Sequence, residues 1–297
     1  MEVRPAAGHY EWDVTLPCRT VPLEVGTVAF TTIGSGPPVI LIHGYGDTLF
    51  TWRNQLRELP DALQLHALDL IGYGHSDQPP IAYTVDTFVS CLRQFMDAVG
   101  IAAATVVGSS LGGAVALCLA KLHPERVNRL VLLGPTIPGV QPGGRAFDLT
   151  FWLAYHGRLA RWLLQPRFKP FVRAALREAV ADPSLITDDL VAHYATLAQR
   201  PGFRDVYVST AQNWHAWAAQ RPRFGELKMP VLIIWGEGDR VHPVRQAALL
   251  QTLIPQAELV RVPQCGHLPH IEHPERINTL LRQFIGVGAR VSAVGTV

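Results

Sequence analysis

The chain has 297 residues, enough for one large domain or two ordinary ones. With 48% hydrophobic and 17% charged residues, the composition excludes a disordered chain. A formal net charge of +2 excludes a broad basic face, so we expect no nucleic-acid partner. The first residues show no apolar secretory segment, and the most apolar stretch, 106–120, is shorter than the ~20 residues that span a bilayer. We therefore expect a cytoplasmic protein without stable membrane insertion.

Short apolar runs alternate with amphipathic segments of helical length, which is typical of an α/β fold with a mostly parallel sheet. The predicted strands are 10–16, 26–32, 39–42, 65–70, 105–107, 127–133, 231–235 and 259–262. The predicted helices between them are 50–59, 85–99 with Thr84 as N-cap, 111–122, 244–253 and 274–285. The sequence thus predicts an eight-stranded sheet flanked by helices.

The alternation stops between residues 134 and 228. A Pro/Gly-rich linker is followed by helical stretches at 148–164, 170–181, 187–200 and 202–217, without a convincing strand. Residues 135–229 hold 13 of the 25 aromatic residues, including Trp152, Trp162, Trp214 and Trp217. They also hold 12 basic and 7 acidic residues, a net charge of +5, which indicates either a solvated basic surface or attraction for acidic substrates. We expect a core domain of 1–134 and 229–297, with a helical cap of 135–228 inserted after the sixth strand.

The third predicted strand ends in the sequence IHGYG, which contains two closely spaced glycines. An oxyanion needs two N–H donors at fixed positions, and glycines let a backbone approach closely. We expect the Tyr45 N–H to be one donor, with His43 holding the loop rather than acting as a base. The second donor is the N–H of Leu111, the residue after the candidate nucleophile described next.

The sequence GSSLGG directly follows a strand and begins a helix. A serine at a sharp strand-to-helix turn has strained backbone angles, so the residues two before and two after it must lack bulk. Gly108 and Gly112 meet that need. The sequence therefore predicts a nucleophile elbow with Ser110 as the nucleophile.

A catalytic serine needs a base, and the base needs an orienting acid. The strand at 231–235 is followed by GEGD and the strand at 259–262 by QCGH, which places polar residues at the same sheet edge as Ser110. Asp239 is the predicted acid, with Glu237 as a rival, and His267 is the predicted base.

Neither a metal nor a cofactor is expected. The four cysteines are scattered, without a C-x-x-C pair that would indicate a zinc site or disulfide framework. His270 and His273 follow His267 at three-residue spacing, but Pro269 and Pro274 interrupt the segment. Three residues at that spacing also spread over too wide an arc for one tetrahedral face.

The motifs HGYG, DLIGYGHSD, GSSLGG, GEGD and CGHLPHIEHPE, in this order, resemble the α/β-hydrolase fold superfamily, and within it the capped serine hydrolases: esterases, lipases and C–C bond hydrolases. The resemblance implies a catalytic triad of Ser110, Asp239 and His267, an oxyanion hole at Tyr45 and Leu111, and two-step acyl transfer. It also implies that the DLIGYGHSD segment is a structural turn.

Departures from the family patterns narrow the chemistry. Dehalogenases and epoxide hydrolases carry aspartate where this chain has Ser110, and hydrolases of ring-cleavage products often carry tryptophan where it has Leu268. We therefore expect a carboxylic ester hydrolase acting on small to medium apolar esters, as a monomer or homodimer. A C–C bond hydrolase, a lactonase, a perhydrolase and a slow-turnover receptor for a small ligand remain alternatives.

Overall fold

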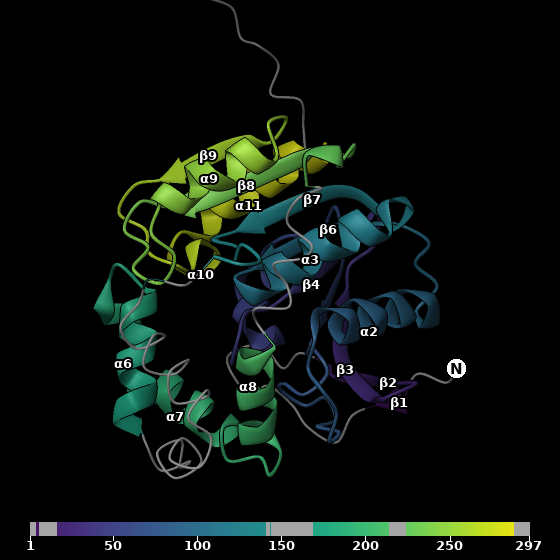
Figure 1. The fold of residues 1–297 in the computed structure, drawn as a ribbon, viewed down its shortest axis with the longest axis vertical. Coiled ribbons are helices and arrows are strands. Elements are labelled where there is room, and N and C mark those ends of the chain that lie inside the picture. Colours follow the sequence, from purple (N-terminus) through teal and green to yellow (C-terminus); the bar gives the residue numbers. More distant parts are fainter. Residues whose placement is uncertain (1–3, 6–16, 141–142, 144–168, 214–223, 288–297) are drawn as a thin grey trace, which may run out of the picture.

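The computed structural model describes residues 4–5, 17–140, 143, 169–213 and 224–287, and a nine-stranded sheet runs through them (Figure 1). The strands are β1 (Arg4–Pro5), β2 (Arg19–Leu23), β3 (Gly26–Ile33), β4 (Pro38–Ile42), β5 (Gln64–Leu68), β6 (Ala104–Ser109), β7 (Val127–Leu133), β8 (Val231–Gly236) and β9 (Glu258–Val262). Their order is β1-β2-β3-β5-β4-β6-β7-β8-β9. Pairing is antiparallel from β1 to β5 and parallel from β5 to β9.

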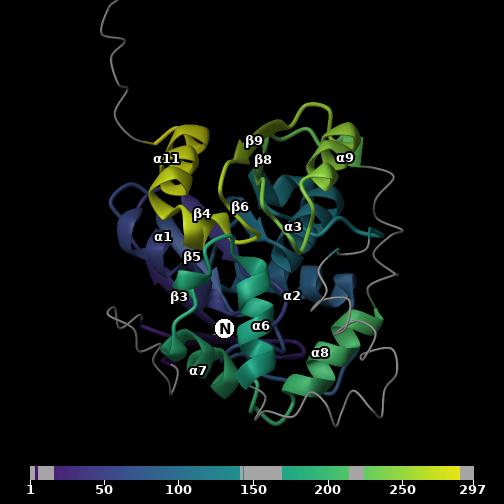
Figure 2. The same ribbon diagram turned by 90° about the vertical axis from the view of Figure 1, so that its left-hand side faces the viewer.

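Helices cover both faces of this sheet (Figure 2). The core helices are α1 (Arg53–Glu58), α2 (Val85–Ala98), α3 (Leu111–Leu122), α9 (Arg245–Leu253), α10 (Pro269–Glu272) and α11 (Pro274–Ile285), with the short 3-10 helix η1 (Leu49–Trp52) before α1. Helices α2, α3 and α9 lie on one face, and α1 and α11 lie on the other.

The central strands are mostly apolar, and both of their faces are buried. In β4, Ile40 and Ile42 belong to the hydrophobic cluster under α2 and α3, whereas Val39 and Leu41 belong to the cluster under α1 and α11. This alternation follows from the two-residue period of a strand. It fixes the register of the sheet and hence the positions of the loops at its carboxyl edge.

The predicted mostly parallel sheet with flanking helices is confirmed. The predicted helices 111–122 and 274–285 have the bounds of α3 and α11, and the Thr84 side chain accepts a hydrogen bond from the Thr87 N–H at the start of α2. The described residues form nine strands, because β1 and β2 join the seven predicted strands that lie among these residues. Strand β2 was not predicted because Pro22 disfavours a strand reading. The predicted strand 10–16 lies outside the described residues.

Within 135–228, the described residues contain helices and no strand. These are α6 (Lys169–Ala179), η3 (Pro183–Leu185), α7 (Asp188–Leu197) and α8 (Phe203–Gln212), which lie together beside the core in Figure 1. The predicted helix 148–164, part of the predicted helix 202–217 and the four tryptophans named above lie outside the described residues. The division into core and cap stays a prediction.

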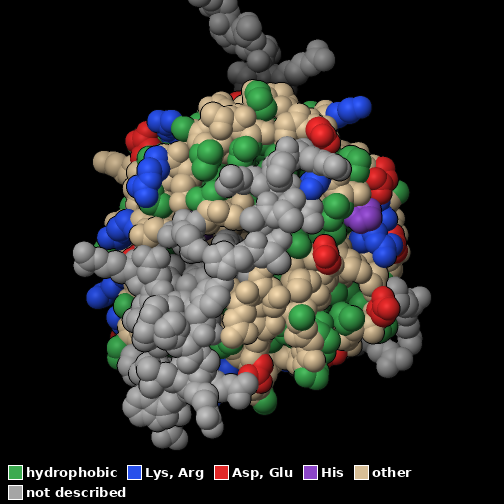
Figure 3. Space-filling model, in the orientation of Figure 1, with side chains coloured by type: hydrophobic (Ala, Val, Ile, Leu, Met, Phe, Trp, Pro, Cys, Tyr) green, Lys and Arg blue, Asp and Glu red, His purple; other side chains and the backbone are tan. Residues whose placement is uncertain are grey.

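The described surface carries charges of both signs. Figure 3 shows Lys and Arg side chains along the left edge of the molecule, the side where Figure 1 places α6 and β9. Helix α6 contributes Lys169, Arg173 and Arg177, and Arg173 forms an ion pair with Asp188. Among the described helices, none is long and apolar enough to cross a membrane.

Candidate active site

Ser110 lies at the sharp turn between β6 and α3. Its backbone angles are φ 51° and ψ −117°, a strained combination for a residue with a side chain. A Cβ on Gly108 would lie 2.3 Å from the Gly112 carbonyl oxygen, and a Cβ on Gly112 would lie 2.3 Å from the Ile42 carbonyl oxygen. Only glycine fits at both positions, so the local sequence holds Ser110 at the elbow as predicted from G-x-S-x-G.

The loop after β4 passes close to Ser110. A Cβ on Gly44 would lie 3.2 Å from the Ser110 Cβ, so the backbone of this loop passes beside the predicted nucleophile. Leu111 is the first residue of α3, where an N–H has no acceptor within the helix. The two predicted oxyanion donors, on Tyr45 and Leu111, therefore belong to segments that flank Ser110 on either side.

Both ring nitrogens of His43 are used to hold this loop. Nε2 accepts a hydrogen bond from the Leu70 N–H at 3.0 Å, which leaves Nδ1 to donate to the Gly44 carbonyl at 2.7 Å. The ring is fully buried. His43 is thus placed as a structural residue, with no free nitrogen to take a proton from Ser110.

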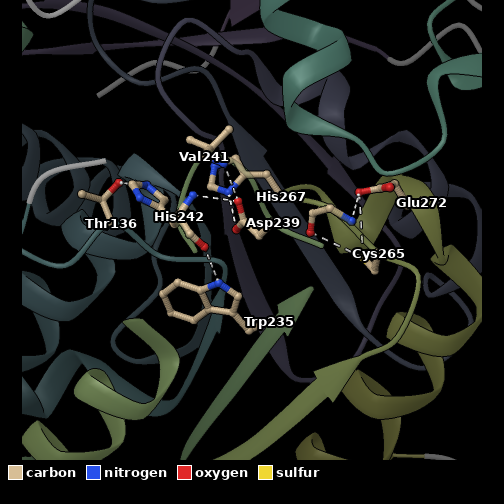
Figure 4. Close-up of polar contacts among 9 residues, drawn as sticks. Thr136, Trp235, Asp239, Val241, His242, Cys265, His267 and Glu272 are labelled. Carbon is tan, nitrogen blue, oxygen red and sulfur yellow. Dashed lines mark hydrogen bonds and ion pairs between the residues drawn. The ribbon is translucent and has the colours of Figure 1, made fainter. Parts of the chain in front are cut away.

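Asp239 and His267 form a buried pair (Figure 4). His267 Nδ1 lies 2.8 Å from Asp239 Oδ2, and Asp239 Oδ1 accepts hydrogen bonds from the N–H groups of Val241 (2.9 Å) and His242 (2.7 Å). A carboxylate at Nδ1 fixes the proton there and leaves Nε2 with its lone pair. Nε2 is buried and forms no hydrogen bond to any described residue, Ser110 included; such catalytic contacts often tighten only when substrate binds.

The end of β7 brings this pair to the nucleophile. A Cβ on Gly134 would lie 3.2 Å from His267 Nδ1 and 3.3 Å from Asp239 Oδ2, and the residue before it, Leu133, accepts a hydrogen bond from the Ser110 N–H at 3.1 Å. One short backbone segment therefore bonds to Ser110 and passes beside His267 and Asp239.

Glu237, the alternative candidate for the acid, is not part of the buried pair with His267. Glu237 is exposed, whereas Asp239 is 5% exposed and makes the hydrogen bonds described above. Glu237 also lies one residue beyond β8, before the chain turns toward His267. The geometry favours Asp239 over Glu237 as the residue that orients His267.

The end of α6 is hydrogen-bonded to the histidine loop. The His267 N–H donates to the Ala179 carbonyl at 2.7 Å. Glu272 accepts from the Ala181 N–H at 2.6 Å and from the Gly266 N–H at 2.8 Å. Burial raises the pKa of Glu272, while the two N–H donors oppose that shift. No sequence signal pointed to the contacts of Ala179 with His267 and of Ala181 with Glu272, because each joins segments about 90 residues apart through a backbone group of the first.

Two tyrosines hold the loop after β4, which carries the predicted oxyanion donor Tyr45 and is called the oxyanion loop below. The Tyr45 hydroxyl donates to the Tyr207 carbonyl of α8 at 2.7 Å, and the two rings stack with centroids 4.0 Å apart. The Tyr194 hydroxyl of α7 donates to Asp47 Oδ1 at 2.6 Å. Sequence reasoning missed Asp47, Tyr194 and Tyr207, since a lone polar residue in a helix or loop carries no pattern.

His270 and His273 have separate structural partners. His270 Nε2 lies 2.8 Å from the Thr51 hydroxyl, and its ring stacks on Trp52 at 4.4 Å. His273 Nε2 lies 3.1 Å from the Gln264 carbonyl oxygen. Among the described residues, no group of three or more His, Cys, Asp and Glu side chains is placed to hold a metal ion.

The DLIGYGHSD segment is a structural turn. Asp69 Oδ1 accepts a hydrogen bond from the Leu49 N–H and Oδ2 from the His75 N–H, both at 2.7 Å. The Ser76 hydroxyl donates back to the Asp69 carbonyl at 2.6 Å. These bonds use Asp69 to tie the end of β5 to η1, and they give it no part in the site.

The comparisons identify the family. The model of the alpha/beta hydrolase fold family matches residues 37–274, so the chain belongs to this family, and the predicted resemblance is confirmed. The chain is similar to a 2-hydroxymuconate semialdehyde hydrolase of Pseudomonas sp. (strain CF600), at 33% identity over 85% of this chain and 88% of that protein. It is also similar to a 2-hydroxy-6-oxo-2,4-heptadienoate hydrolase of Pseudomonas putida, at 32% identity over 85% and 90%.

Solved structures agree. A meta-cleavage product hydrolase from Pseudomonas fluorescens IP01 superposes with a TM-score of 0.78 at 29% identity, covering 90% of this chain and 97% of that one. Cfl2 from Burkholderia cenocepacia superposes with a TM-score of 0.84 at 24% identity, over 95% and 99%, which supports the fold alone. The chain is thus a hydrolase of the serine hydrolase superfamily.

Proposed function

We propose that this protein hydrolyses a C–C bond in a 2-hydroxy-6-oxo-dienoate, with Ser110 as nucleophile, His267 as base and Asp239 as orienting acid. The observation that carries the proposal is the likeness, over 85% of the chain, to two hydrolases named for such substrates or their semialdehyde relatives. The buried His267–Asp239 pair supports the same assignment.

The substrate named for the second relative suggests why a serine can break a carbon–carbon bond. A dienoate with a hydroxyl on C2 and an oxo group on C6 can tautomerise to a ketone at C2. The electrons of the C5–C6 bond then have a conjugated acceptor, so carbon becomes an acceptable leaving group. What the protein must supply is attack on C6 and stabilisation of the resulting oxyanion.

Each step of the proposed reaction is assigned to a residue of the site. His267 Nε2 takes the proton of Ser110 as Oγ attacks C6, and the N–H groups of Tyr45 and Leu111 stabilise the oxyanion. When the C5–C6 bond breaks, its electron pair forms a dienolate with the charge on the C2 oxygen, and protonated His267 gives its proton to that dienolate. Water, activated by His267, then hydrolyses the acyl group from Ser110. Asp239 holds the imidazole in the required tautomer throughout.

We further propose that 135–228 is a cap over this site and that the partner is a small molecule, with no cofactor or metal needed. The contacts of α6 with the His267 loop and of α8 with Tyr45 support the cap, because they join this region to both sides of the site. An acyl transfer of this kind uses side chains and backbone N–H groups alone.

Ester hydrolysis is the second candidate, and Leu268 is the residue that favours it. Because hydrolases of ring-cleavage products often carry tryptophan there, Leu268 alone ranks an ester above a C–C bond. The names of the relatives favour the opposite order. The same triad and oxyanion donors would serve both reactions, which differ in the leaving group.

A pair of substrates that deliver the same acetyl group separates the two. We expect kcat/KM for 2-hydroxy-6-oxo-2,4-heptadienoate to exceed that for p-nitrophenyl acetate by at least about hundredfold, because specificity is expressed in transition-state binding. Equal or faster cleavage of the ester would overturn the C–C proposal in favour of an esterase. A single slow turnover of both would point to a receptor.

A further inference from the structure

One continuous set of hydrogen bonds joins the nucleophile to the acid. The Ser110 carbonyl accepts from the Thr136 N–H at 2.9 Å, and the Thr136 hydroxyl lies 3.0 Å from His242 Nε2. The His242 N–H donates to Asp239 Oδ1 at 2.7 Å, and Asp239 Oδ2 holds His267 at 2.8 Å. Between Ser110 and Asp239, the contact of Thr136 with His242 is the link made by two side chains.

His242 is held at three points (Figure 4). Besides the Thr136 hydroxyl and Asp239, its carbonyl accepts a hydrogen bond from Trp235 Nε1 at 2.8 Å. The residue is 2% exposed, and Thr136 is also 2% exposed. A residue that is held at its N–H, its carbonyl and its ring has little freedom to move. His242 can therefore couple the position of the loop after β8 to that of the loop after β7.

The ring of His242 also faces the base. Its centroid lies 4.9 Å from that of His267, with the planes at 66°. Burial and, to a smaller extent, the neighbouring His267 lower the pKa of His242 to about 3, while Asp239 acts in the opposite direction. A neutral ring beside His267 leaves the single positive charge of the catalytic cycle on the base.

We propose that Thr136 and His242 form a positioning bridge, which sets the Ser110 hydroxyl at the correct distance from His267 Nε2. Neither residue touches the reacting atoms in this account, and the inference rests on the proposed hydrolase activity. The bridge joins the loop after β7, next to the nucleophile, with the loop after β8, which carries the acid. Small displacements between a nucleophile and its base are costly to kcat, which is where loss of the bridge would act.

The test removes the bridging hydroxyl alone. Thr136→Val keeps the shape and volume of the side chain, and Thr136→Ser keeps the hydroxyl. We expect Thr136→Val to lower kcat on the dienoate about tenfold with KM within twofold, and Thr136→Ser to retain most of the activity. Thr31→Val is the matched control, since the Thr31 hydroxyl in β3 is buried and has no partner among the described residues.

A double variant tests whether the two side chains act together. His242→Phe keeps a planar ring without nitrogens. If the bridge exists, Thr136→Val combined with His242→Phe lowers kcat no more than about twofold below the worse single variant, because the second change has nothing left to break. Losses that multiply would overturn the bridge, as would a Thr136→Val enzyme with parental kcat or a Thr136→Ser enzyme as impaired as Thr136→Val.

Failure of the bridge and failure of the proposed function give different results. Ser110→Ala, assayed beside the variants, loses turnover if the proposed function is right, whatever the bridge does. An inactive Ser110→Ala with a fully active Thr136→Val would contradict the bridge alone. An active Ser110→Ala would contradict the function on which the bridge rests. Urea unfolding of each variant separates a lower kcat from a smaller folded fraction.

Discussion

The two sides of the site are built in different ways. On the nucleophile side, one continuous segment from β6 into α3 fixes Ser110, and Gly108 and Gly112 permit the close packing that its strained backbone requires. On the acid–base side, Asp239 and His267 lie in loops 28 residues apart and are held by hydrogen bonds from several segments. The first side depends on local backbone geometry and the second on long-range polar contacts.

This difference predicts which substitutions should reduce both stability and activity, and which should reduce activity alone. A Cβ added to the elbow meets backbone atoms, which cannot move away, so it should reduce stability together with activity. A polar atom removed on the acid–base side should reduce activity while leaving most of the packing intact. The four predictions that follow test this contrast in order of expected effect.

The largest effect is expected at the acid. Asp239→Asn presents an amide N–H₂ or carbonyl to His267 Nδ1 and no longer fixes the tautomer, so kcat should fall about 10⁴-fold. The fold should remain, since the side chains are nearly equal in size. Steady-state kinetics on the dienoate measures the loss, and Glu237→Gln on the exposed neighbouring carboxylate is the matched control, expected to stay within twofold of the parent.

At the elbow, Gly112→Ala should cost about 3 kcal/mol of unfolding free energy, because its Cβ would lie 2.3 Å from the Ile42 carbonyl oxygen. Gly100→Ala provides the comparison: its φ is +76° but nothing lies within 4 Å, so only the backbone conformation is penalised, by about 1 kcal/mol. Urea unfolding measures both. Equal losses would mean that the close packing of the elbow is not what requires glycine at 112.

Acid should weaken the fold through the buried histidines. Burial lowers the pKa of His270 from 6.5 to about 3, with smaller contributions from Arg53 and His267. The unfolded chain therefore binds a proton below pH 6.5 that the folded chain refuses until about pH 3. The stability contributed by the neutral ring is complete above pH 6.5 and is lost as the pH falls toward 3.

For one such histidine the loss between pH 7 and pH 5 is about 2 kcal/mol. His270→Gln keeps a polar group near Thr51 without titrating, so its unfolding free energy should fall less than that of the parent over this range. His123→Gln, at a histidine whose side chain is 34% exposed, is the control and should behave as the parent does. A variant at His270 with the full parental pH dependence would show that burial of this ring does not suppress its protonation.

The smallest effect is expected where α8 meets the oxyanion loop. Tyr45→Phe removes the hydroxyl that donates to the Tyr207 carbonyl, a loss of about 1 kcal/mol, so kcat/KM should fall about fivefold. Tyr83→Phe removes a similar bond, to the Pro79 carbonyl at 2.9 Å, away from the oxyanion loop. If both variants lose the same activity, the contact of Tyr45 with α8 has no special part in holding the loop.

The same contrast explains what could be predicted from the sequence. The elbow was predictable because its requirements, a strand, a glycine on each side and a helix, are adjacent in the chain. The positions of Asp239 and His267 followed from the rule that parallel strands open their loops at one edge. Thr136 and His242 were not predictable, since two separate polar residues in loops reveal a partnership only when the sheet brings them together.

Two further points show how little a single residue can decide in a prediction from sequence. Strand β2 escaped prediction because of Pro22, although it pairs with β3 over its whole length. The ranking of an ester above a C–C bond rested on Leu268, one position in a site of many. Likeness along 85% of the chain carries more information about the reaction than that one side chain does, and it favours the C–C bond.

The central claim is that Ser110 performs the cleavage, and Ser110→Ala tests it most directly. Alanine keeps the Cβ and makes the same demands on the backbone, so the unfolding free energy should change by less than about 1 kcal/mol. We predict that kcat on 2-hydroxy-6-oxo-2,4-heptadienoate falls at least about 10³-fold. A folded Ser110→Ala protein that cleaves this substrate within tenfold of the parental rate would contradict the account.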